Sequence, residues 1–236
     1  MFNLTDAVLG FSKRARAKRN RFFRNSFRLT ADTRILDLGS ESGQNITNVL
    51  STTPIQPKNV YIADIDNNAI ERGKESFGFV PVLLNEDGLI PFPDDFFDIV
   101  YCSSVIEHVT LPKEDVWLVK SEKEFRRLAR TRQQQFANEI KRVGKQYFVQ
   151  TPYRYFPIES HSWLPLVAFL PRFLLLFVIS ATNRFWIKQT IPDWHLLTNK
   201  ELQSLFSDAT IVKEVYLGMP KSLIAIRRAP YYTGLT

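Results

Sequence analysis

The spacing of hydrophobic positions changes several times along the chain, and each change predicts an element. From residue 34 to residue 151, short apolar runs alternate with stretches in which apolar residues recur every three or four positions. The apolar runs predict strands at 35–38, 60–63, 80–84, 97–102 and 146–151. The longer spacing predicts helices through 46–50, around Ile70 and over 122–143. This alternation is typical of parallel strands joined by right-handed helical crossovers.

The C-terminal part shows a different pattern. Two strand-like runs, 211–216 and 222–227, flank a Gly218-Met219-Pro220 turn and follow a predicted helix over 200–206. Two strands this close in the sequence predict an antiparallel hairpin. Together, these patterns predict an α/β fold with a mostly parallel seven-stranded sheet that ends in an antiparallel hairpin.

The charge and hydrophobic pattern of residues 1–30 predicts a basic amphipathic helix. Eight basic residues lie in 1–28 against the single acid Asp6, and phenylalanines recur between them at helical spacing. The remaining basic and acidic residues balance, so this segment accounts for the formal net charge of +7. The helix either packs over the domain with its arginines in solvent or docks on an anionic membrane surface. Because the excess charge is confined to one segment, we expect no nucleic-acid partner.

The most hydrophobic segment, residues 163–187, lies within a predicted helical insertion at 157–195. A membrane-spanning helix needs about twenty mostly apolar residues. Pro165, Pro171 and Arg172 divide this segment into shorter pieces, so we expect no membrane span. Two interpretations remain open, namely a hydrophobic cap over a substrate cleft and an interfacial hairpin that enters one leaflet.

The size and the cysteine content bound the class of protein. A chain of 236 residues with 44% hydrophobic residues can bury one sizeable core, which predicts a single domain over 31–236. The lone cysteine, Cys102, cannot form an intramolecular disulfide, and no secretory leader opens the sequence. These features favour a cytoplasmic location, peripheral on the inner face of a membrane if the basic helix docks there.

The run from Ile35 to Asn45 carries the first candidate site. It ends a strand with Asp37 and then turns through Gly39 and Gly43 into a helix. Such a turn brings backbone and a helix N-terminus close to a ligand at the carboxyl edge of the sheet. We expect a side chain at either glycine to collide with that ligand. The spacing does not fit the dinucleotide fingerprint G-x-G-x-x-G, which disfavours an NAD-linked oxidoreductase.

The second predicted strand ends in Asp64, about twenty residues after the glycine turn. An acid there is placed to accept hydrogen bonds from both hydroxyls of a ribose. Asp66 is the alternative ribose-binding acid. Either acid could instead cap the helix that begins near Asn67.

Two further segments complete the pattern. Glu86 and Asp87 precede a Pro-Phe-x-Asp-x-x-Phe-Asp stretch at 91–98 that leads into the fourth strand. That strand leads into the run Ser103-Ser104-Val105-Ile106-Glu107-His108-Val109.

In this order, the four segments resemble those of class I S-adenosylmethionine-dependent methyltransferases. The Ser-x-x-Glu-His-Val run is similar to that of small-molecule enzymes such as the quinone-pathway methyltransferases. The resemblance implies a Rossmann-like fold, S-adenosylmethionine as the cofactor, and an adenine contact from Glu86 or Asp87. Glu41 departs from the family pattern, which has a glycine at that position. The expected cofactor-binding residues are Asp37, Gly39, Ser40, Gly43, Asp64, Ile65, Glu86, Asp87 and Ser103.

The expected catalytic residues are His161, His108 and Glu107, whereas His195 has a weaker claim. Methyl transfer mainly requires positioning, and a base is needed only when the acceptor must lose a proton. His161 closes a Thr-Pro-x-x-x-Phe-Pro-x-Glu-x-His pattern that resembles some bacterial members, although it could instead fix its loop through Glu159. One cysteine and three scattered histidines form no zinc pattern, so we expect no metal.

We therefore expect S-adenosylmethionine-dependent methyl transfer to a small-molecule or lipid-like acceptor, with oxygen as the favoured nucleophile. The hydrophobic segment and the basic helix favour an amphiphilic acceptor at a membrane over a polar metabolite under a lid. The alternative, motivated by Glu41, is a methyltransferase-like protein that binds a ligand or a partner without catalysis.

Overall fold

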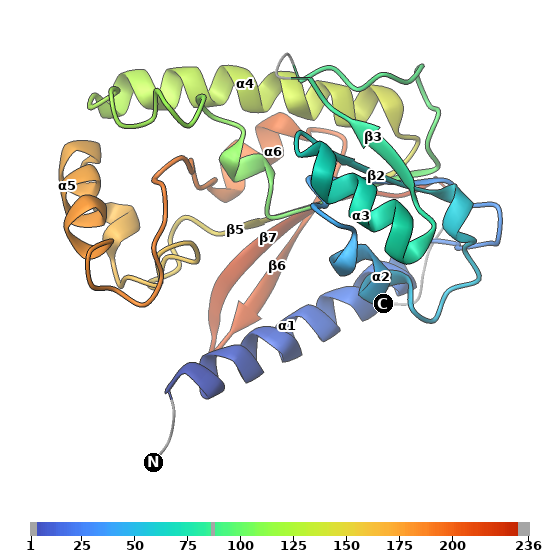
Figure 1. Ribbon diagram of the computed structural model, residues 1–236, viewed down its shortest axis with the longest axis horizontal. Helices are drawn as coiled ribbons and strands as arrows, with labels where there is room; N and C mark the ends of the chain where they lie inside the picture. The colour runs from blue at the N-terminus through green and yellow to red at the C-terminus, as the bar shows by residue number, and fades with distance from the viewer. Residues whose placement is uncertain (1–3, 86–87, 231–236) are drawn as a thin grey trace.

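A seven-stranded sheet forms the centre of the protein (Figure 1). The computed structural model describes residues 4–85 and 88–230, with side chains from residue 14 onward. The strands are β1 (Ile35–Leu38), β2 (Val60–Asp64), β3 (Val80–Leu83), β4 (Ile99–Ser103), β5 (Tyr147–Pro152), β6 (Thr210–Tyr216) and β7 (Met219–Arg227). Their order is β3-β2-β1-β4-β5-β7-β6, parallel as far as β5 and antiparallel at β7 and β6. The predicted fold class is confirmed.

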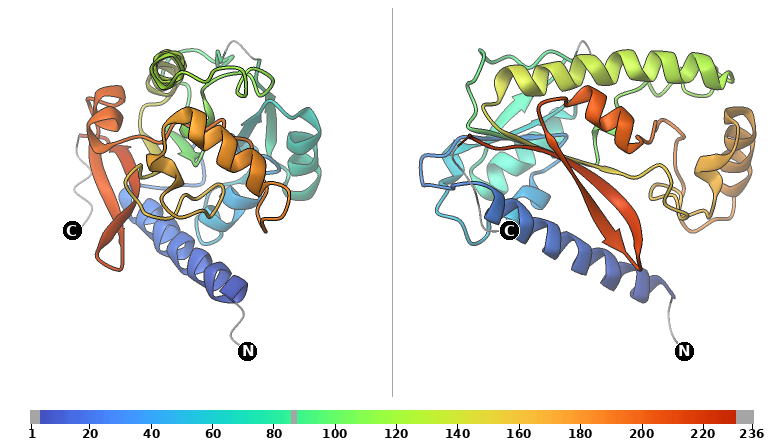
Figure 2. Two further views of the ribbon diagram at one scale, coloured as in Figure 1. Left: turned by 90° about the vertical axis from the view of Figure 1, so that its left-hand side faces the viewer. Right: turned by 180° about the vertical axis from the view of Figure 1, so that it is seen from behind.

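Helices cover both faces of the sheet (Figure 2). The α-helices of the described residues are α1 (Leu4–Ser26), α2 (Gln44–Leu50), α3 (Asn67–Phe77), α4 (Glu122–Val143), α5 (Arg172–Thr182) and α6 (Asn199–Leu205). Ile35 belongs to the core that α1, α2 and α3 cover, and its neighbour Leu36 belongs to the core beneath α4 and α6. Successive residues of a strand point to opposite faces, so the central strands are hydrophobic on both sides.

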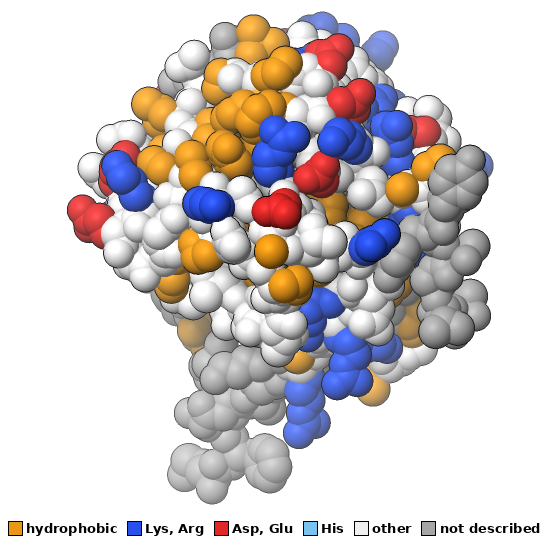
Figure 3. Space-filling model, turned by 90° about the vertical axis from the view of Figure 1, so that its right-hand side faces the viewer, with side chains coloured by type: hydrophobic (Ala, Val, Ile, Leu, Met, Phe, Trp, Pro, Cys, Tyr) orange, Lys and Arg blue, Asp and Glu red, His pale blue; other side chains and the backbone are white. Residues whose placement is uncertain are grey.

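The predicted N-terminal helix packs on the sheet. Phe23 of α1 is fully buried, and its ring centroid lies 5.2 Å from that of Tyr101 and 5.4 Å from that of Phe148. Basic residues on the other side of the helix, among them Arg14 and Arg21, are exposed. Lysine and arginine side chains gather around this helix at the lower edge of Figure 3. The helix therefore joins the core through its aromatic side and leaves its basic side in solvent.

The insertion at 157–195 forms an extension at one end of the sheet, around α5 (Figure 1). Its own hydrophobic cluster consists of Leu164, Val167, Leu175, Ile179, Trp194 and Leu196. Arg172, which we expected only to interrupt the apolar segment, is buried at the start of α5. Its guanidinium donates hydrogen bonds of 2.7 Å to the carbonyl oxygens of Val116 and Val119 and lies 3.4 Å from the ring centroid of Phe125. Arg172 thus ties the insertion to the segment before α4.

Among the helices of residues 4–85 and 88–230, none combines the length and the apolar character that a membrane crossing requires.

The starts of two strands differ from the prediction by two residues or more, and the other strand boundaries differ by at most one. β4 begins at Ile99 because Phe97 makes only an isolated bridge with Gly144. The hairpin turn lies at Leu217 and Gly218, since Met219 already pairs with β6.

Candidate functional site

The candidate segments meet at the carboxyl edge of three adjacent strands. β1 lies between β2 and β4, and Leu38 pairs with Ala63 on one side and with Cys102 on the other. The loops that follow these residues therefore begin side by side. This edge is where α/β sheets commonly bind their ligands.

The loop between β1 and α2 makes a tight turn. Gly39 and Gly43 have φ values of 67° and 74°, which favour glycine. A Cβ on Gly39 would lie 2.4 Å from a methyl carbon of Val105, and one on Gly43 would lie 3.0 Å from the ring of Phe79. These glycines therefore allow the loop to pack against neighbouring side chains, a reason that the sequence does not reveal. Glu41 also has a positive φ, 50°, although it is not a glycine.

A cleft of about 780 Å³ lies between this loop and α1. The expected residues Asp37, Gly39, Ser40 and Ser103 line it, whereas Gly43 is buried and is not among the lining residues. Oδ2 of Asp37 and Oγ of Ser40 are buried there without a hydrogen-bond partner. Buried polar atoms normally have partners, so these two fit a polar ligand that supplies them.

The charge of Asp37 indicates the kind of ligand. Burial raises the pKa of its carboxyl group well above the usual value of 3.8, and the carboxylate of Asp64 raises it further. A cation bound in the cleft would stabilise the ionised form. Asp37 therefore favours a positively charged ligand.

The two acids that follow β2 have different partners. Oδ2 of Asp64 accepts a 2.9 Å hydrogen bond from the amide of Glu41, and Oδ1 accepts one of 3.1 Å from the amide of Asp66. Oδ1 of Asp66 accepts hydrogen bonds from the amides of Asn68 and Ala69 and caps α3. Asp64 thus faces the glycine loop, whereas Asp66 is occupied at the helix.

Among the described residues, Asp64 and Ile65 are the expected cofactor residues still to be placed, and neither lines the cleft. Ile65 is exposed. Asp64 is connected to the cleft by its hydrogen bond with the amide of Glu41, a residue that lines the cleft. Glu86 and Asp87 lie outside the described residues, so the expected adenine contact stays a prediction.

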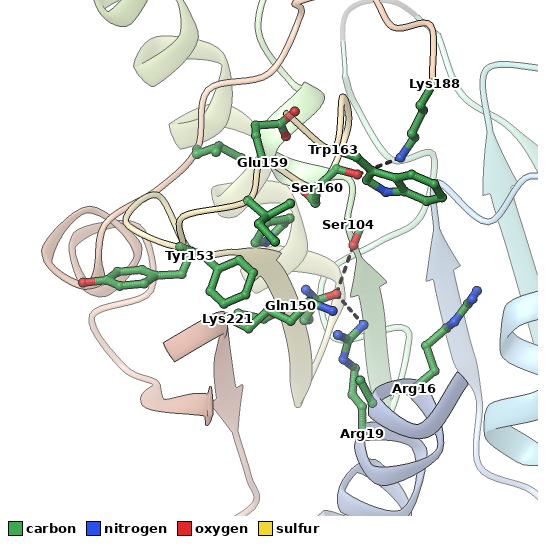
Figure 4. Close-up of a pocket in the computed structure, with 16 residues that line it drawn as sticks. Arg16, Arg19, Ser104, Gln150, Tyr153, Glu159, Ser160, Trp163, Lys188 and Lys221 are labelled. Carbon is green, nitrogen blue, oxygen red and sulfur yellow. Dashed lines mark hydrogen bonds between the residues drawn. The ribbon is translucent and has the colours of Figure 1, made fainter. Parts of the chain in front are cut away.

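A second pocket, of about 320 Å³, adjoins the cleft (Figure 4). Arg16, Arg19 and Ser104 line both cavities. The ammonium group of Lys188 lies 5.0 Å from the ring centroid of Trp163 at the opposite side of the pocket. The charged lining residues are Arg16, Arg19, Glu159, Lys188 and Lys221.

Arg19 joins α1 to the sheet beside both cavities. Its guanidinium donates hydrogen bonds of 3.0 Å and 2.8 Å to the carboxylate of Glu214, one of 2.8 Å to Oε1 of Gln150 and one of 3.3 Å to Oγ of Ser103. Sequence reasoning missed Arg19 and Gln150. The available signals were the placement of Arg19 one turn before the buried Phe23 and the polar Gln150 within an apolar strand.

The three expected catalytic residues come together although His161 is distant in the sequence from the other two. Glu107 and His108 belong to a short 3₁₀ helix, Ile106–His108, and His161 belongs to the loop after β5. Nε2 of His161 lies 3.7 Å from Oε1 of Glu107, and Nδ1 of His161 lies 2.6 Å from Oε1 of Glu159. The ring centroids of the two histidines are 4.5 Å apart, and Nδ1 of His108 lies 2.8 Å from Oδ1 of Asp193.

The surroundings of His161 affect its protonation. Burial opposes the positive charge, but interactions with Glu107 and Glu159 outweigh it and raise the pKa of His161 to about 9. An imidazolium offers no free lone pair, so in this state His161 is not a base at neutral pH. The loop-fixing contact with Glu159 is present, and a catalytic role stays a prediction.

His195 lies deeper in the protein. It is buried, its Nδ1 lies 2.9 Å from Oε1 of Gln133, and burial lowers its pKa to about 4. His195 therefore stays the weakest of the three histidines as a candidate catalytic residue.

Residues 36–147, from β1 into β5, match a family model described as a methyltransferase domain. A search of curated proteins returned no match. Several solved structures share the fold. A protein from Pyrococcus horikoshii is 16% identical over 92% of this chain and 90% of its own, with a TM-score of 0.54. A Mesorhizobium loti S-adenosylmethionine-dependent methyltransferase is 15% identical over 90% and 96%, with a TM-score of 0.53.

A third solved structure, a putative O-methyltransferase from Nostoc punctiforme, is 13% identical over 90% of this chain and 55% of its own, with a TM-score of 0.53. At these identities the likeness concerns the fold alone. The match over residues 36–147 is to a methyltransferase domain, and the fold of the chain is similar to that of a solved S-adenosylmethionine-dependent methyltransferase. These matches imply S-adenosylmethionine as the cofactor. The orphan atoms of Asp37 and Ser40 fit this cationic, polar cofactor.

Proposed function

We propose that the protein transfers the methyl group of S-adenosylmethionine to an oxygen atom of a small-molecule or lipid-like acceptor that carries an anionic group. The main support is the wall that the two cavities share, formed by Arg16, Arg19 and Ser104. Direct transfer requires donor and acceptor to lie in contact and in line. Two adjoining cavities with a common wall suit this requirement.

In this proposal, the cleft holds the cofactor. Asp37 and Ser40 would bind its amino-acid part, and Asp64 would accept from the ribose hydroxyls, because a carboxylate can accept more than the two hydrogen bonds it has here. The bound cofactor supplies an electrophilic methyl group on a sulfonium. The glycine loop and α1 would position this methyl group for transfer to the acceptor. The other proposed cofactor residues remain Gly39, Gly43, Ile65, Glu86, Asp87 and Ser103.

The second pocket is the proposed acceptor site. Four of its five charged lining residues are basic, and the acid, Glu159, already accepts hydrogen bonds from His161 and Ser162. Trp163 adds an apolar surface. This lining suits an acceptor with an acidic group and an apolar body. The acceptor oxygen would lose its proton to solvent water as it gains the methyl group, and the demethylated cofactor would leave the cleft. Glu107, His108 and His161 are the proposed residues that orient the acceptor oxygen.

The acceptor class can be tested by transfer of a labelled methyl group to paired acceptors that differ only in a carboxylate. Lys221→Gln should raise KM for the carboxylated member about tenfold, because one charge-assisted hydrogen bond contributes about 1.5–3 kcal/mol. The matched control, Lys213→Gln, removes an exposed lysine from the adjacent strand. Equal methylation of both acceptors, or equal effects of the two variants, would contradict the anionic acceptor.

We also propose that the protein docks peripherally on an anionic membrane surface. Large apolar side chains are exposed on α5 and its flanking loops: Leu166, Phe169, Phe173, Leu174, Phe177, Phe185, Ile187 and Ile191. Phe177 is 71% exposed and Phe185 75%. Contiguous exposed apolar groups of this kind mark interaction surfaces. These exposed side chains favour insertion into a membrane interface over a role as a cap, because the apolar side chains of a cap would point toward the cleft.

The basic side of α1 supports lipid as the partner. The N-terminal end of α1 and α5 face the same side of the protein (Figures 1 and 2). Apolar insertion combined with attraction between basic side chains and anionic headgroups is the usual energetics of interfacial helices.

Flotation with vesicles of phosphatidylglycerol and phosphatidylcholine tests this docking. The wild-type protein should float with the anionic vesicles, and Phe177→Ser with Phe185→Ser should abolish flotation. Leu89→Ser, which changes an exposed leucine on the loop after β3, serves as the control. Wild-type protein that stays with the bottom fraction at physiological salt would refute membrane docking without affecting the methyltransferase proposal.

A non-catalytic role remains the alternative because Glu41 occupies the glycine loop. Calorimetric titration with S-adenosylmethionine separates the two. Absence of cofactor binding by the wild-type protein would favour the non-catalytic alternative.

A further inference from the structure

The cluster of Glu107, His108 and His161 has the composition of a metal site. One donor atom from each of the three residues lies within 4.8 Å of the other two. Two imidazole nitrogens and one carboxylate oxygen are a donor set that Zn²⁺, Fe²⁺, Mn²⁺ and similar ions bind in proteins. The cluster draws its donors from two segments, the 3₁₀ helix after β4 and the loop after β5.

One carboxylate oxygen of Glu107 has no hydrogen-bond partner. Its side chain is completely buried, and Oε2 accepts a 3.0 Å hydrogen bond from Oγ1 of Thr151. Oε1 is buried without a hydrogen-bond partner. The 3.7 Å to Nε2 of His161 is too long for a hydrogen bond. A buried carboxylate oxygen without a hydrogen bond is costly and favours a cation nearby, and without a metal ion the protonated ring of His161 is such a cation.

Each histidine is oriented by its own carboxylate. Nδ1 of His161 bonds to Glu159, and Nδ1 of His108 bonds to Asp193. Glu159 is itself fixed, because its second oxygen accepts from the amide and the hydroxyl of Ser162 at 2.6 Å and 2.7 Å. A carboxylate that holds the proton on Nδ1 orients the ring, and a divalent ion can then take the place of the proton on Nε2, as in most histidine metal ligands.

We propose that Glu107, His108 and His161 bind one divalent transition-metal ion through Oε1 and the two Nε2 atoms. Ligand atoms about 2.1 Å from a tetrahedral Zn²⁺ lie about 3.4 Å apart. The 3.7 Å from Nε2 of His161 to Oε1 of Glu107 is close to this value, the donor atoms all lie within 4.8 Å of one another, and a small movement of the partly exposed His108 would bring its donor closer. Two of the three proposed ligand atoms are imidazole nitrogens, so the site should prefer Zn²⁺ over Mg²⁺.

The location connects the metal with the acceptor pocket. Glu159 and Ser160, which line that pocket, immediately precede His161. Three protein ligands leave at least one coordination position open. The ion would therefore hold the loop after β5 against the end of β4 and offer a position for an acceptor oxygen. Metal binding itself does not depend on the proposed acceptor, so each can fail alone.

Isothermal titration of chelator-treated full-length protein with Zn²⁺, together with the visible spectrum of the Co²⁺-loaded protein, tests the site. We expect about one equivalent of bound Zn²⁺, d–d bands from nitrogen and oxygen ligands, and a higher Tm with metal. Glu107→Gln retains the acceptor for Thr151 and should weaken Zn²⁺ binding at least 100-fold. Asp193→Asn, which alters only the orientation of His108, should weaken it about 10–100-fold.

His195→Asn is the control, since this third histidine lies outside the cluster and should leave the stoichiometry unchanged. Melting of each metal-free variant checks its fold. Absence of Zn²⁺ binding by the wild-type protein would overturn the proposal, and so would undiminished affinity in a folded Glu107→Gln variant. Either result would leave the cluster as a charged network that fixes the loop.

Discussion

The amide of Glu41 donates a 2.9 Å hydrogen bond to Oδ2 of Asp64, so the residue that replaces a glycine in the first loop contacts the acid that closes β2. This contact turns the Asp64 carboxylate toward the glycine loop. Asp66, only two residues further on, is instead committed to the first turn of α3.

This difference predicts different outcomes for two neighbouring substitutions. Asp64→Ala removes the acceptor for the Glu41 amide and for the ribose hydroxyls, and should weaken S-adenosylmethionine binding about 10–100-fold. Asp66→Ala should leave the affinity unchanged but lower the free energy of unfolding by about 1 kcal/mol, the usual contribution of a helix N-cap. Calorimetric titration and urea denaturation measure the two quantities. Equal losses of affinity in both variants would refute Asp64 as the ribose-binding acid.

Glu41 adopts a left-handed backbone conformation that favours glycine. That conformation costs a non-glycine residue about 1–2 kcal/mol, and the greater freedom of glycine in the unfolded chain offsets part of the gain. Glu41→Gly should therefore stabilise the protein by about 0.5–1 kcal/mol and retain cofactor binding. Glu41→Ala removes the carboxylate but not the backbone cost, so it should not stabilise the protein. Equal melting temperatures for the two variants would show that the side chain, not the backbone, determines the effect.

Asp37 couples stability to cofactor binding. Its pKa is raised in the folded protein by burial and by Asp64, so the folded state holds the proton more tightly than the unfolded state. The contribution of Asp37 to stability therefore falls as the pH rises above about 3.8 through the folded pKa. Asp37→Asn does not titrate, and should be more stable than wild type by about 1–3 kcal/mol at neutral pH.

The same substitution should weaken the binding of the cationic cofactor, because the ionised carboxylate attracts it. Wild-type affinity should be higher at an alkaline than at an acidic pH, because the raised pKa of Asp37 opposes its ionisation at the acidic one, while the affinity of Asp37→Asn stays low and constant. Melting curves and calorimetric titrations at both pH values test this. A variant that binds as tightly as wild type at the higher pH would show that Asp37 does not contact the cofactor.

The order of the elements could be predicted from the sequence because local patterns determine it. The apolar runs at 35–38 and 60–63 are buried on both faces, and each ends in an acid before a helix, which places Asp37 and Asp64 at one edge of the sheet. The small errors at Phe97 and Met219 arise where pairing depends on the neighbouring strand.

The contacts between distant segments could not be predicted in this way. Arg19 reaches Gln150 and Ser103 only because of the angle at which α1 crosses the sheet, and no local pattern encodes that angle. The same holds for the metal-site geometry. His161 meets Glu107 across 54 positions because the loop after β5 folds back, so the donors show no regular spacing in the sequence.

The packing of α1 leads to a test of the domain boundary near residue 30. Phe23 contacts Tyr101 and Phe148, which belong to β4 and β5. We therefore propose that α1 is part of the folding unit rather than a separable membrane arm. Phe23→Ala should lower the free energy of unfolding by about 3–5 kcal/mol, as expected for a buried phenylalanine. Arg21→Ala changes an exposed residue of the same helix and should alter it by less than about 0.5 kcal/mol. Urea denaturation measures both values, and a Phe23→Ala variant as stable as the Arg21→Ala control would identify residues 1–30 as an independent arm.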